Sequence, residues 1–117
     1  MEVLMVRLIN IAAVIRSKNS GPSELTLDII FKSNALFIQA KDSGVFNSSM
    51  IAGLYKKPVD DIISIVSFEP ANAIKITMKR DVISGDASDS DIYGAQQHAP
   101  LLNIEFNNVE GEPYESF

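Results

Sequence analysis

The sequence contains no cysteine and only one histidine, His98. Without cysteine the chain has no disulfide framework, thiolate nucleophile, zinc–thiolate site or iron–sulfur ligand. Basic residues are also few, with ten Lys and Arg against fifteen Asp and Glu, for a net charge of −5. They form no basic run, so the sequence has no cluster of Lys and Arg that could neutralise the phosphates of a nucleic acid. We therefore expect no nucleic-acid partner.

Glycine and proline are at ordinary levels, six and five among 117 residues, which excludes a collagen-like repeat and a wholly disordered chain. The hydrophobic share of 46% and charged share of 21% are typical of one compact domain. We expect a single α+β domain over residues 1–106. The acidic, Gly- and Pro-containing residues 107–117 are expected to form a loose tail.

A long unbroken hydrophobic run is missing as well. Residues 1–15 are mostly apolar, but Glu2, Arg7 and Asn10 interrupt them. The uninterrupted apolar runs are therefore far shorter than the roughly 18 residues of a membrane span. No cleavage-type site follows a positively charged start, so we predict a cytoplasmic protein that is not bound to a membrane. Apolar residues at helical spacing predict a first helix that ends near Lys18. They are Leu4, Leu8, Ile11 and Ile15.

The remaining hydrophobic patterns predict short strands and helices. Strands are expected at 25–31, 62–68, 73–79 and 101–106, and helices at 34–42 and 50–55. Residues 69–72 fit a tight turn, which makes the second and third strands an antiparallel hairpin. The fold class is therefore α+β, a small two-layer sandwich of about four mainly antiparallel strands with three helices.

Asp28 lies in the middle of the apolar strand 25–31. A carboxylate inside a covered strand is costly unless it is paired or hydrogen-bonded. Two interpretations are open: Asp28 points to a sheet edge or a loop, or it meets Arg16 or Lys18.

The segment 84–100 is long and polar, and such loops are often functional. It contains Tyr93, Gln96, Gln97 and His98. One interpretation is a short helical turn whose side chains pin the loop to the sheet. The other is a polar pocket in which His98 acts as acid, base or anion ligand near neutral pH.

Three aspartates in this segment, Asp86, Asp89 and Asp91, invite a metal interpretation, because hard cations bind clustered carboxylates. Their spacing lacks the alternate-residue order, central Gly and closing Glu of a calcium loop. One histidine without cysteine also disfavours a transition-metal centre. We predict no metal and no cofactor.

A second polar cluster comprises Arg16, Lys18 and Asn19. These donors beside a glycine suit a carboxylate or phosphate, which Arg16 can bind through two hydrogen bonds. The alternative is local: cations in the last turn of a helix compensate its dipole.

These segments resemble an uncharacterised family, domain of unknown function 4387. The similar strings are VIRSKNSGP at 14–22, LTLDIIF at 25–31, PANAIK at 70–75 and DIYGAQQHAPLL at 91–102. Members of that family are small proteins, often encoded beside, or fused to, larger proteins of the acyclic terpene utilisation type. The resemblance implies a partner subunit in the catabolism of small organic acids or their thioesters, and it assigns no catalytic residue.

Three functions are compatible with these observations. The first is an accessory subunit of that larger catabolic enzyme. The second is a stand-alone carboxylic-acid lyase or isomerase, with Arg16 and Lys18 holding the acid and His98 or Asp28 moving a proton. The third is a module that binds an anionic small molecule. We also expect a homo-oligomer, in which the first helix and an edge strand are buried in a symmetric dimer.

One hypothesis joins the polar clusters into a single ligand- or partner-binding site. The end of the predicted first helix, the turn at Asn72 and the segment with Gln96, Gln97 and His98 converge in it. Cations would hold a carboxylate and the amides would fix its orientation. The hypothesis requires Arg16 and His98 to lie on the same face of the domain.

Overall fold

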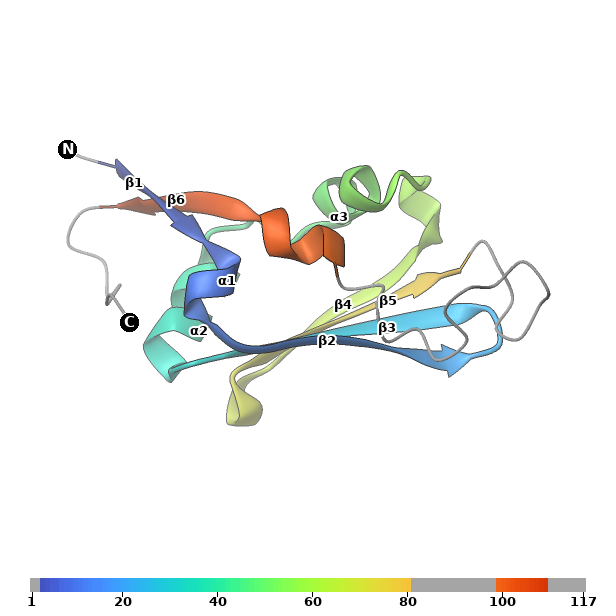
Figure 1. The fold of residues 1–117 in the computed structure, drawn as a ribbon, viewed down its shortest axis with the longest axis horizontal. Coiled ribbons are helices and arrows are strands. Elements are labelled where there is room, and N and C mark those ends of the chain that lie inside the picture. Colours follow the sequence, from blue (N-terminus) through green and yellow to red (C-terminus); the bar gives the residue numbers. More distant parts are fainter. Residues whose placement is uncertain (1–2, 81–98, 110–117) are drawn as a thin grey trace.

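A computed structural model describes residues 3–80 and 99–109 of the chain (Figure 1). It contains two antiparallel sheets and a set of short helices. In chain order the elements are β1 Val3–Arg7, α1 Leu8–Ile11, β2 Ala12–Gly21, β3 Glu24–Phe31, α2 Asn34–Asp42, α3 Ser48–Tyr55, η1 Val59–Asp61, β4 Ile62–Phe68, η2 Glu69–Ala71, β5 Ala73–Lys79, η3 Ala99–Asn103 and β6 Glu105–Val109.

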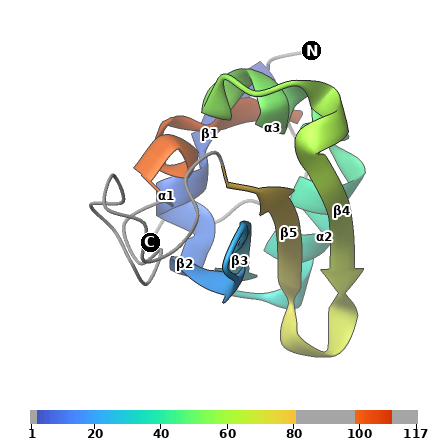
Figure 2. The same cartoon turned by 90° about the vertical axis from the view of Figure 1, so that its right-hand side faces the viewer.

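The main sheet has four antiparallel strands in the order β2-β3-β5-β4. Two hairpins build it: β2 and β3 flank the turn after Gly21, and β4 and β5 flank η2. Strand β5 then inserts beside β3, so these two strands are central and β2 and β4 are the edges (Figure 2). The predicted strands 25–31, 62–68 and 73–79 and the hairpin between the last two are confirmed.

The predicted first helix is wrong. Only the single turn α1 is helical, and Arg16 and Lys18 lie on strand β2 rather than in a last helical turn. Valine and isoleucine are frequent in this stretch, and β-branched side chains favour strands. Pairing with β2 also satisfies the backbone groups of one edge of β3, which a helix would leave without a strand partner.

Helices α2 and α3 lie close to their predicted positions, and polar side chains cap both. The Ser33 hydroxyl accepts a hydrogen bond from the Leu36 backbone N–H, and the side-chain Oδ1 of Asn47 accepts one from the Met50 backbone N–H. The N-cap of α2 is thus Ser33, directly before the first helical residue Asn34. Both caps satisfy backbone N–H groups that have no partner inside the helix.

The C-terminal part differs from the prediction of a strand over 101–106. Residues Ala99–Asn103 form η3, and the strand β6 begins only at Glu105 and continues through Val109. Strand β6 pairs with β1 as a separate two-stranded sheet. The Leu8 amide donates a hydrogen bond of 3.0 Å to the Ile104 carbonyl, which joins the two ends of the described chain.

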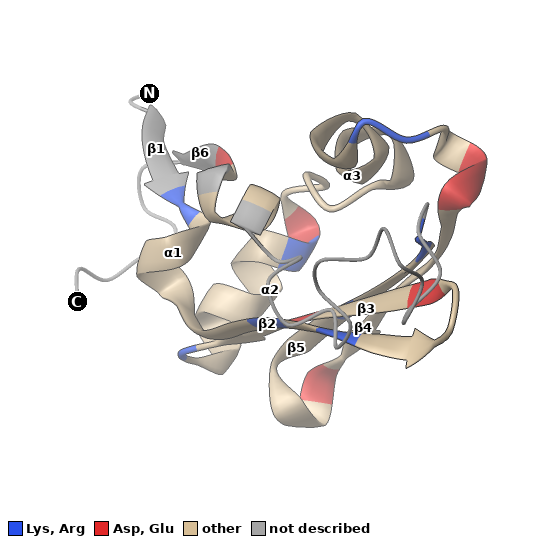
Figure 3. Ribbon diagram, turned by 45° about the vertical axis from the view of Figure 1, so that its right-hand side comes forward, with Lys and Arg blue, Asp and Glu red and all other residues tan. Residues whose placement is uncertain are grey.

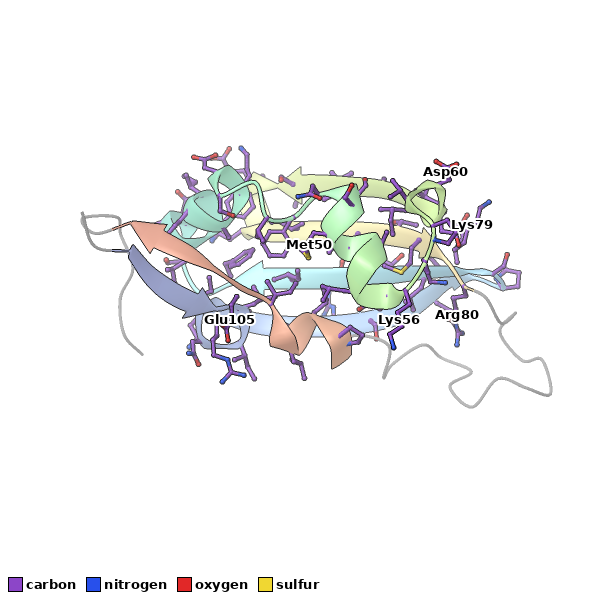
Figure 4. All side chains as sticks on the ribbon, turned by 90° about the horizontal axis from the view of Figure 1, so that it is seen from above. Met50, Lys56, Asp60, Lys79, Arg80 and Glu105 are labelled. Atoms are coloured by element: carbon purple, nitrogen blue, oxygen red, sulfur yellow. The ribbon has the colours of Figure 1, made fainter. Side chains whose placement is uncertain are left out.

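The core lies between one face of the main sheet and the helical layer. Figure 4 looks onto this layer, with α3 and η3 in front of the strands and α2 at one end of them. The alternating residues of β3 and β5 supply the sheet side of the core, because every second side chain of a strand points to the same face. The buried apolar residues include Leu25, Leu27, Ile29, Phe31, Ile74, Ile76 and Met78 from the sheet and Leu8, Ile11, Leu36, Phe37, Ile51, Leu101 and Ile104 from the helical layer.

The architecture confirms the predicted α+β class, with four antiparallel strands in the main sheet and three α-helices. None of the helices in the described parts of the chain combines the length and hydropathy of a membrane span.

Candidate functional site

The opposite face of the main sheet is not covered by any helix or strand among residues 3–80 and 99–109 (Figure 1). We call it the open face. Its side chains alternate with the core-facing ones along each strand, and the strand register arranges them in rows. One row joins Arg16, Asp28, Lys75 and Val66, and the next joins Val14, Ile30, Ala73 and Phe68.

Asp28 and Arg16 form the central contact of the open face. Arg16 Nε donates to Asp28 Oδ2 at 3.3 Å. The Asp28 side chain is only 11% exposed, whereas that of Arg16 is 60% exposed. The guanidinium compensates the carboxylate for much of its lost hydration. The prediction that Asp28 meets Arg16 is therefore confirmed, and the edge or loop placement is wrong, because β3 is central.

Further cations surround this pair. Lys75 lies opposite Asp28 on the side away from Arg16, and Lys18 and Lys79 are exposed on the same face. Glu24 is paired in register with Lys79. The open face thus has more basic than acidic residues. In Figure 3 blue segments on the strands of the sheet mark Lys and Arg positions.

Apolar side chains lie beside these charges on the edge strand β4. Val66 is 51% and Phe68 is 57% exposed. Val66 is the register neighbour of Lys75, so exposed carbon surface and an ammonium group lie next to one another. This mixture of charge and exposed apolar surface is typical of a surface that binds another protein.

Asn19 is not part of the open face. It pairs in register with Leu25, which faces the core, and its Oδ1 accepts a hydrogen bond of 2.7 Å from Arg80 Nη1. The Arg80 amide in turn donates to the Ser23 carbonyl at 2.8 Å. Asn19 therefore ties the β2–β3 hairpin to the end of β5, near the labelled Arg80 in Figure 4.

Asn72 also has a structural contact. It adopts the left-handed backbone conformation that ends η2, with φ at 52°. Its Oδ1 accepts a hydrogen bond of 3.1 Å from Asn34 Nδ2, and its carbonyl accepts one from the Phe31 amide. It precedes Lys75 by three residues, about 10 Å along a strand. The structure thus places Asn72 at the hairpin end of the sheet, away from the row that contains Arg16.

Four predicted site residues, Tyr93, Gln96, Gln97 and His98, lie outside the described residues, as do the aspartates at 86, 89 and 91. Their meeting with Arg16 stays a prediction. Within residues 3–80 and 99–109, no three acidic or histidine side chains are grouped in a way that could hold a metal ion.

The comparisons with known proteins identify a family. Its model, a domain of unknown function (DUF4387), matches residues 8–105. The chain belongs to the DUF4387 family. No curated protein and no solved structure is detectably similar to it. The matched range includes all four strands of the main sheet, so the open face belongs to the DUF4387 domain itself.

Two features of the DUF4387 site were missed by sequence reasoning. Alternation in residues 73–79 showed that Lys75 and Lys79 share an exposed face, but only the strand order places that face beside Arg16. The exposure of Val66 and Phe68 could not be predicted from the sequence, because an apolar strand of this kind is equally typical of the centre of a sheet.

A titratable group of the DUF4387 domain lies in the layer on the other side of the sheet. Burial raises the pKa of the Tyr55 phenol on α3 above its ordinary value of 10.0, because the charged phenolate loses hydration there. This group therefore stays neutral and does not contribute charge to the protein.

Proposed function

We propose that this DUF4387 protein is a cytoplasmic accessory subunit that docks through its open face onto a larger catabolic enzyme. The partner is a protein of the acyclic terpene utilisation type, which acts on small organic acids or their thioesters. The observation that carries the proposal is the placement of Arg16, Lys75 and Val66 in one register row, on a sheet face that no helix or strand among the described residues covers.

The chemistry of the open face defines the surface that it fits. The row with Val14 and Phe68 offers exposed apolar side chains, 38% and 57% exposed, for burial against a partner. The adjacent row offers the cations Arg16 and Lys75. A complementary partner surface is therefore an apolar patch bordered by carboxylates.

The charges of the open face suit an acidic partner surface. Residues 3–80 and 99–109 contain all ten Lys and Arg of the chain but only seven of its fifteen Asp and Glu, so the net charge of −5 comes from the residues outside these ranges. The open face contributes Arg16, Lys18, Lys75 and Lys79 against Glu24 and Asp28. Electrostatic complementarity of this kind contributes mainly to specificity and to the rate of association.

The alternatives, a stand-alone lyase or isomerase and an anion-binding module, require Arg16 to hold a carboxylate ligand. Its guanidinium already contacts the carboxylate of Asp28 at 3.3 Å. A free acid would have to compete with this contact on a side chain that is 60% exposed to water. The geometry therefore favours protein docking over capture of a small anion.

Co-purification with the larger protein tests the proposal. The tagged chain is expected to retain a purified acyclic terpene utilisation type protein and to raise its turnover of a small-acid thioester. Lys18→Glu with Lys75→Glu should abolish retention, since both positions are on the open face. Lys41→Glu with Lys56→Glu changes the net charge equally at exposed positions of the helical layer and should leave retention unchanged. Equal loss in both double variants, or in neither, would overturn the proposal.

A further inference from the structure

The edge strand β4 lacks the charged residues and proline that usually protect a sheet edge, and its one irregularity is a register shift between Ile62 and Ser64. The strand order leaves its outer side without a strand partner among the described residues. Its seven residues, Ile62–Phe68, include no charged residue, no proline and no glycine. Such an edge presents unpaired N–H and C=O groups to any other strand, and natural proteins usually block it with lysine or proline.

Side-chain exposure along β4 adds an apolar surface to these backbone groups. Ile63, Val66 and Phe68 are 47%, 51% and 57% exposed. Val66 and Phe68 are alternate residues of the strand, and Ile63 lies at the register shift between Ile62 and Ser64, so exposed carbon surface is present along most of β4. An exposed hydrophobic edge strand of this length in a stable protein indicates that another strand covers it.

The other edge strand of the same sheet, β2, carries charged residues and can be compared with β4. Strand β2 carries Arg16 and Lys18, whereas β4 carries no charge, and the pairing of both strands has register shifts. Two copies that met through β2 would place these cations near one another. Two copies that meet through β4 bring no like charges together, because the strand is uncharged. The absence of like charges therefore favours β4 over β2 as the edge at which a second copy of this chain pairs.

We propose that two copies of the chain pair through antiparallel β4 strands, so that the four strands of each copy join in one continuous sheet. A two-fold axis perpendicular to the sheet relates antiparallel strands without turning either sheet over. Both open faces then lie on the same side of the dimer. Val66 and Phe68 of the two copies form an apolar strip between the two sets of cations.

This inference goes beyond the proposed function, because it concerns the edge of the sheet; Val66 and Phe68 belong both to this edge strand and to the open face. It adds a consequence for docking. A dimer of this form presents two docking faces in one plane, so it can engage two partner molecules or two equivalent sites of a symmetric partner.

Ser67 allows the edge to be changed without altering the open face. It pairs in register with Ile74, which faces the core, and its side chain is exposed at the edge. Ser67→Lys places a cation on the pairing edge of each copy, as in natural edge strands that a lysine keeps from pairing. Val66→Lys has the same effect from the open face. Val14→Lys, on the opposite edge strand β2, is the matched control.

Sedimentation equilibrium of the full chain at micromolar concentrations tests the dimer. The wild-type chain and Val14→Lys should sediment as dimers, whereas Ser67→Lys and Val66→Lys should be monomers with unchanged far-UV circular dichroism. A monomeric wild-type chain would overturn the proposal, and so would β4 variants that fold and remain dimeric.

Partner binding separates this proposal from the docking proposal. Ser67→Lys leaves Arg16, Lys18 and Lys75 in place, so the monomeric variant should still retain the larger protein in co-purification. Loss of the dimer with partner binding retained supports β4 pairing alone. Failure of the wild-type chain to dimerise leaves the docking face untouched and overturns only β4 pairing.

Discussion

Arg16 on the edge strand β2 lies directly opposite Asp28 on the central strand β3, with 3.3 Å between Nε and Oδ2. The pair is asymmetric, because the carboxylate is almost covered while the guanidinium is largely in water. A buried carboxylate needs its partner more than an exposed guanidinium does. The contact therefore stabilises the carboxylate of Asp28 on the open face, while the guanidinium of Arg16 stays largely exposed to solvent.

Removing the guanidinium should weaken the fold measurably. Arg16→Ala leaves the carboxylate of Asp28 covered without this donor, and we expect the free energy of unfolding to fall by about 1 kcal/mol. Lys18→Ala, two residues along β2, should change it by less than about 0.5 kcal/mol. Urea denaturation of both variants measures the difference. Equal effects at the two positions would contradict the role of the Arg16–Asp28 contact.

Core truncation should have a much larger effect than truncation on the open face. Ile76 on the central strand β5 is fully buried, and Ile76→Ala is expected to destabilise the protein by about 2–5 kcal/mol through lost burial and a residual cavity. Val66→Ala, at a half-exposed position of the same sheet, should cost less than about 1 kcal/mol. Thermal denaturation followed by circular dichroism distinguishes the two. A larger loss for Val66→Ala would mean that the open face is buried in the isolated protein.

The N-terminus of α2 depends on one hydroxyl group. Ser33→Ala removes the acceptor for the Leu36 amide and should lower the free energy of unfolding by about 1 kcal/mol. Ser49→Ala, at an exposed position within α3, keeps the cap of its helix at Asn47 and should be close to neutral. Chemical denaturation of both variants is the measurement, and an equally neutral Ser33→Ala would remove the cap from this account.

Alkaline pH should destabilise the protein partly through Tyr55. Its pKa is raised in the folded state by burial, so above pH about 10 the unfolded chain releases the phenolic proton first. The stabilising contribution is full below that pH and is lost as the pH rises above it. In Tyr55→Phe the fall of unfolding free energy between neutral and strongly alkaline pH should be smaller than in the wild-type chain. An unchanged slope, measured by urea denaturation at several pH values, would contradict this.

The predicted and observed folds agree where local patterns decide the structure. The β4–β5 hairpin was predictable because Ile74, Ile76 and Met78 alternate with polar residues and Pro70 favours the turn before them. The first helix was wrong because Leu8, Ile11 and Ile15 fit helical spacing while pairing with β3 decides the conformation. That pairing is a tertiary contact, which periodicity does not contain.

Only part of the candidate site could be predicted from the sequence. The oddity of a carboxylate in an apolar strand pointed from Asp28 to Arg16, because burial of a charge requires a partner. Lys75 could not be assigned to the same row, since its place depends on β5 entering the sheet between β3 and β4. Asn19 and Asn72 have the donor groups of a binding site, but in the structure they hold turns and strand ends together.

Photo-cross-linking to the larger protein tests the docking face most directly. A photoreactive phenylalanine analogue replaces Lys75 on the open face in one variant and Lys41 on the exposed side of α2 in another. Each variant is mixed with a purified acyclic terpene utilisation type protein and irradiated, and covalent adducts are measured by mass spectrometry. We expect an adduct from position 75 and none from position 41. An adduct from position 41 with none from position 75 would contradict it.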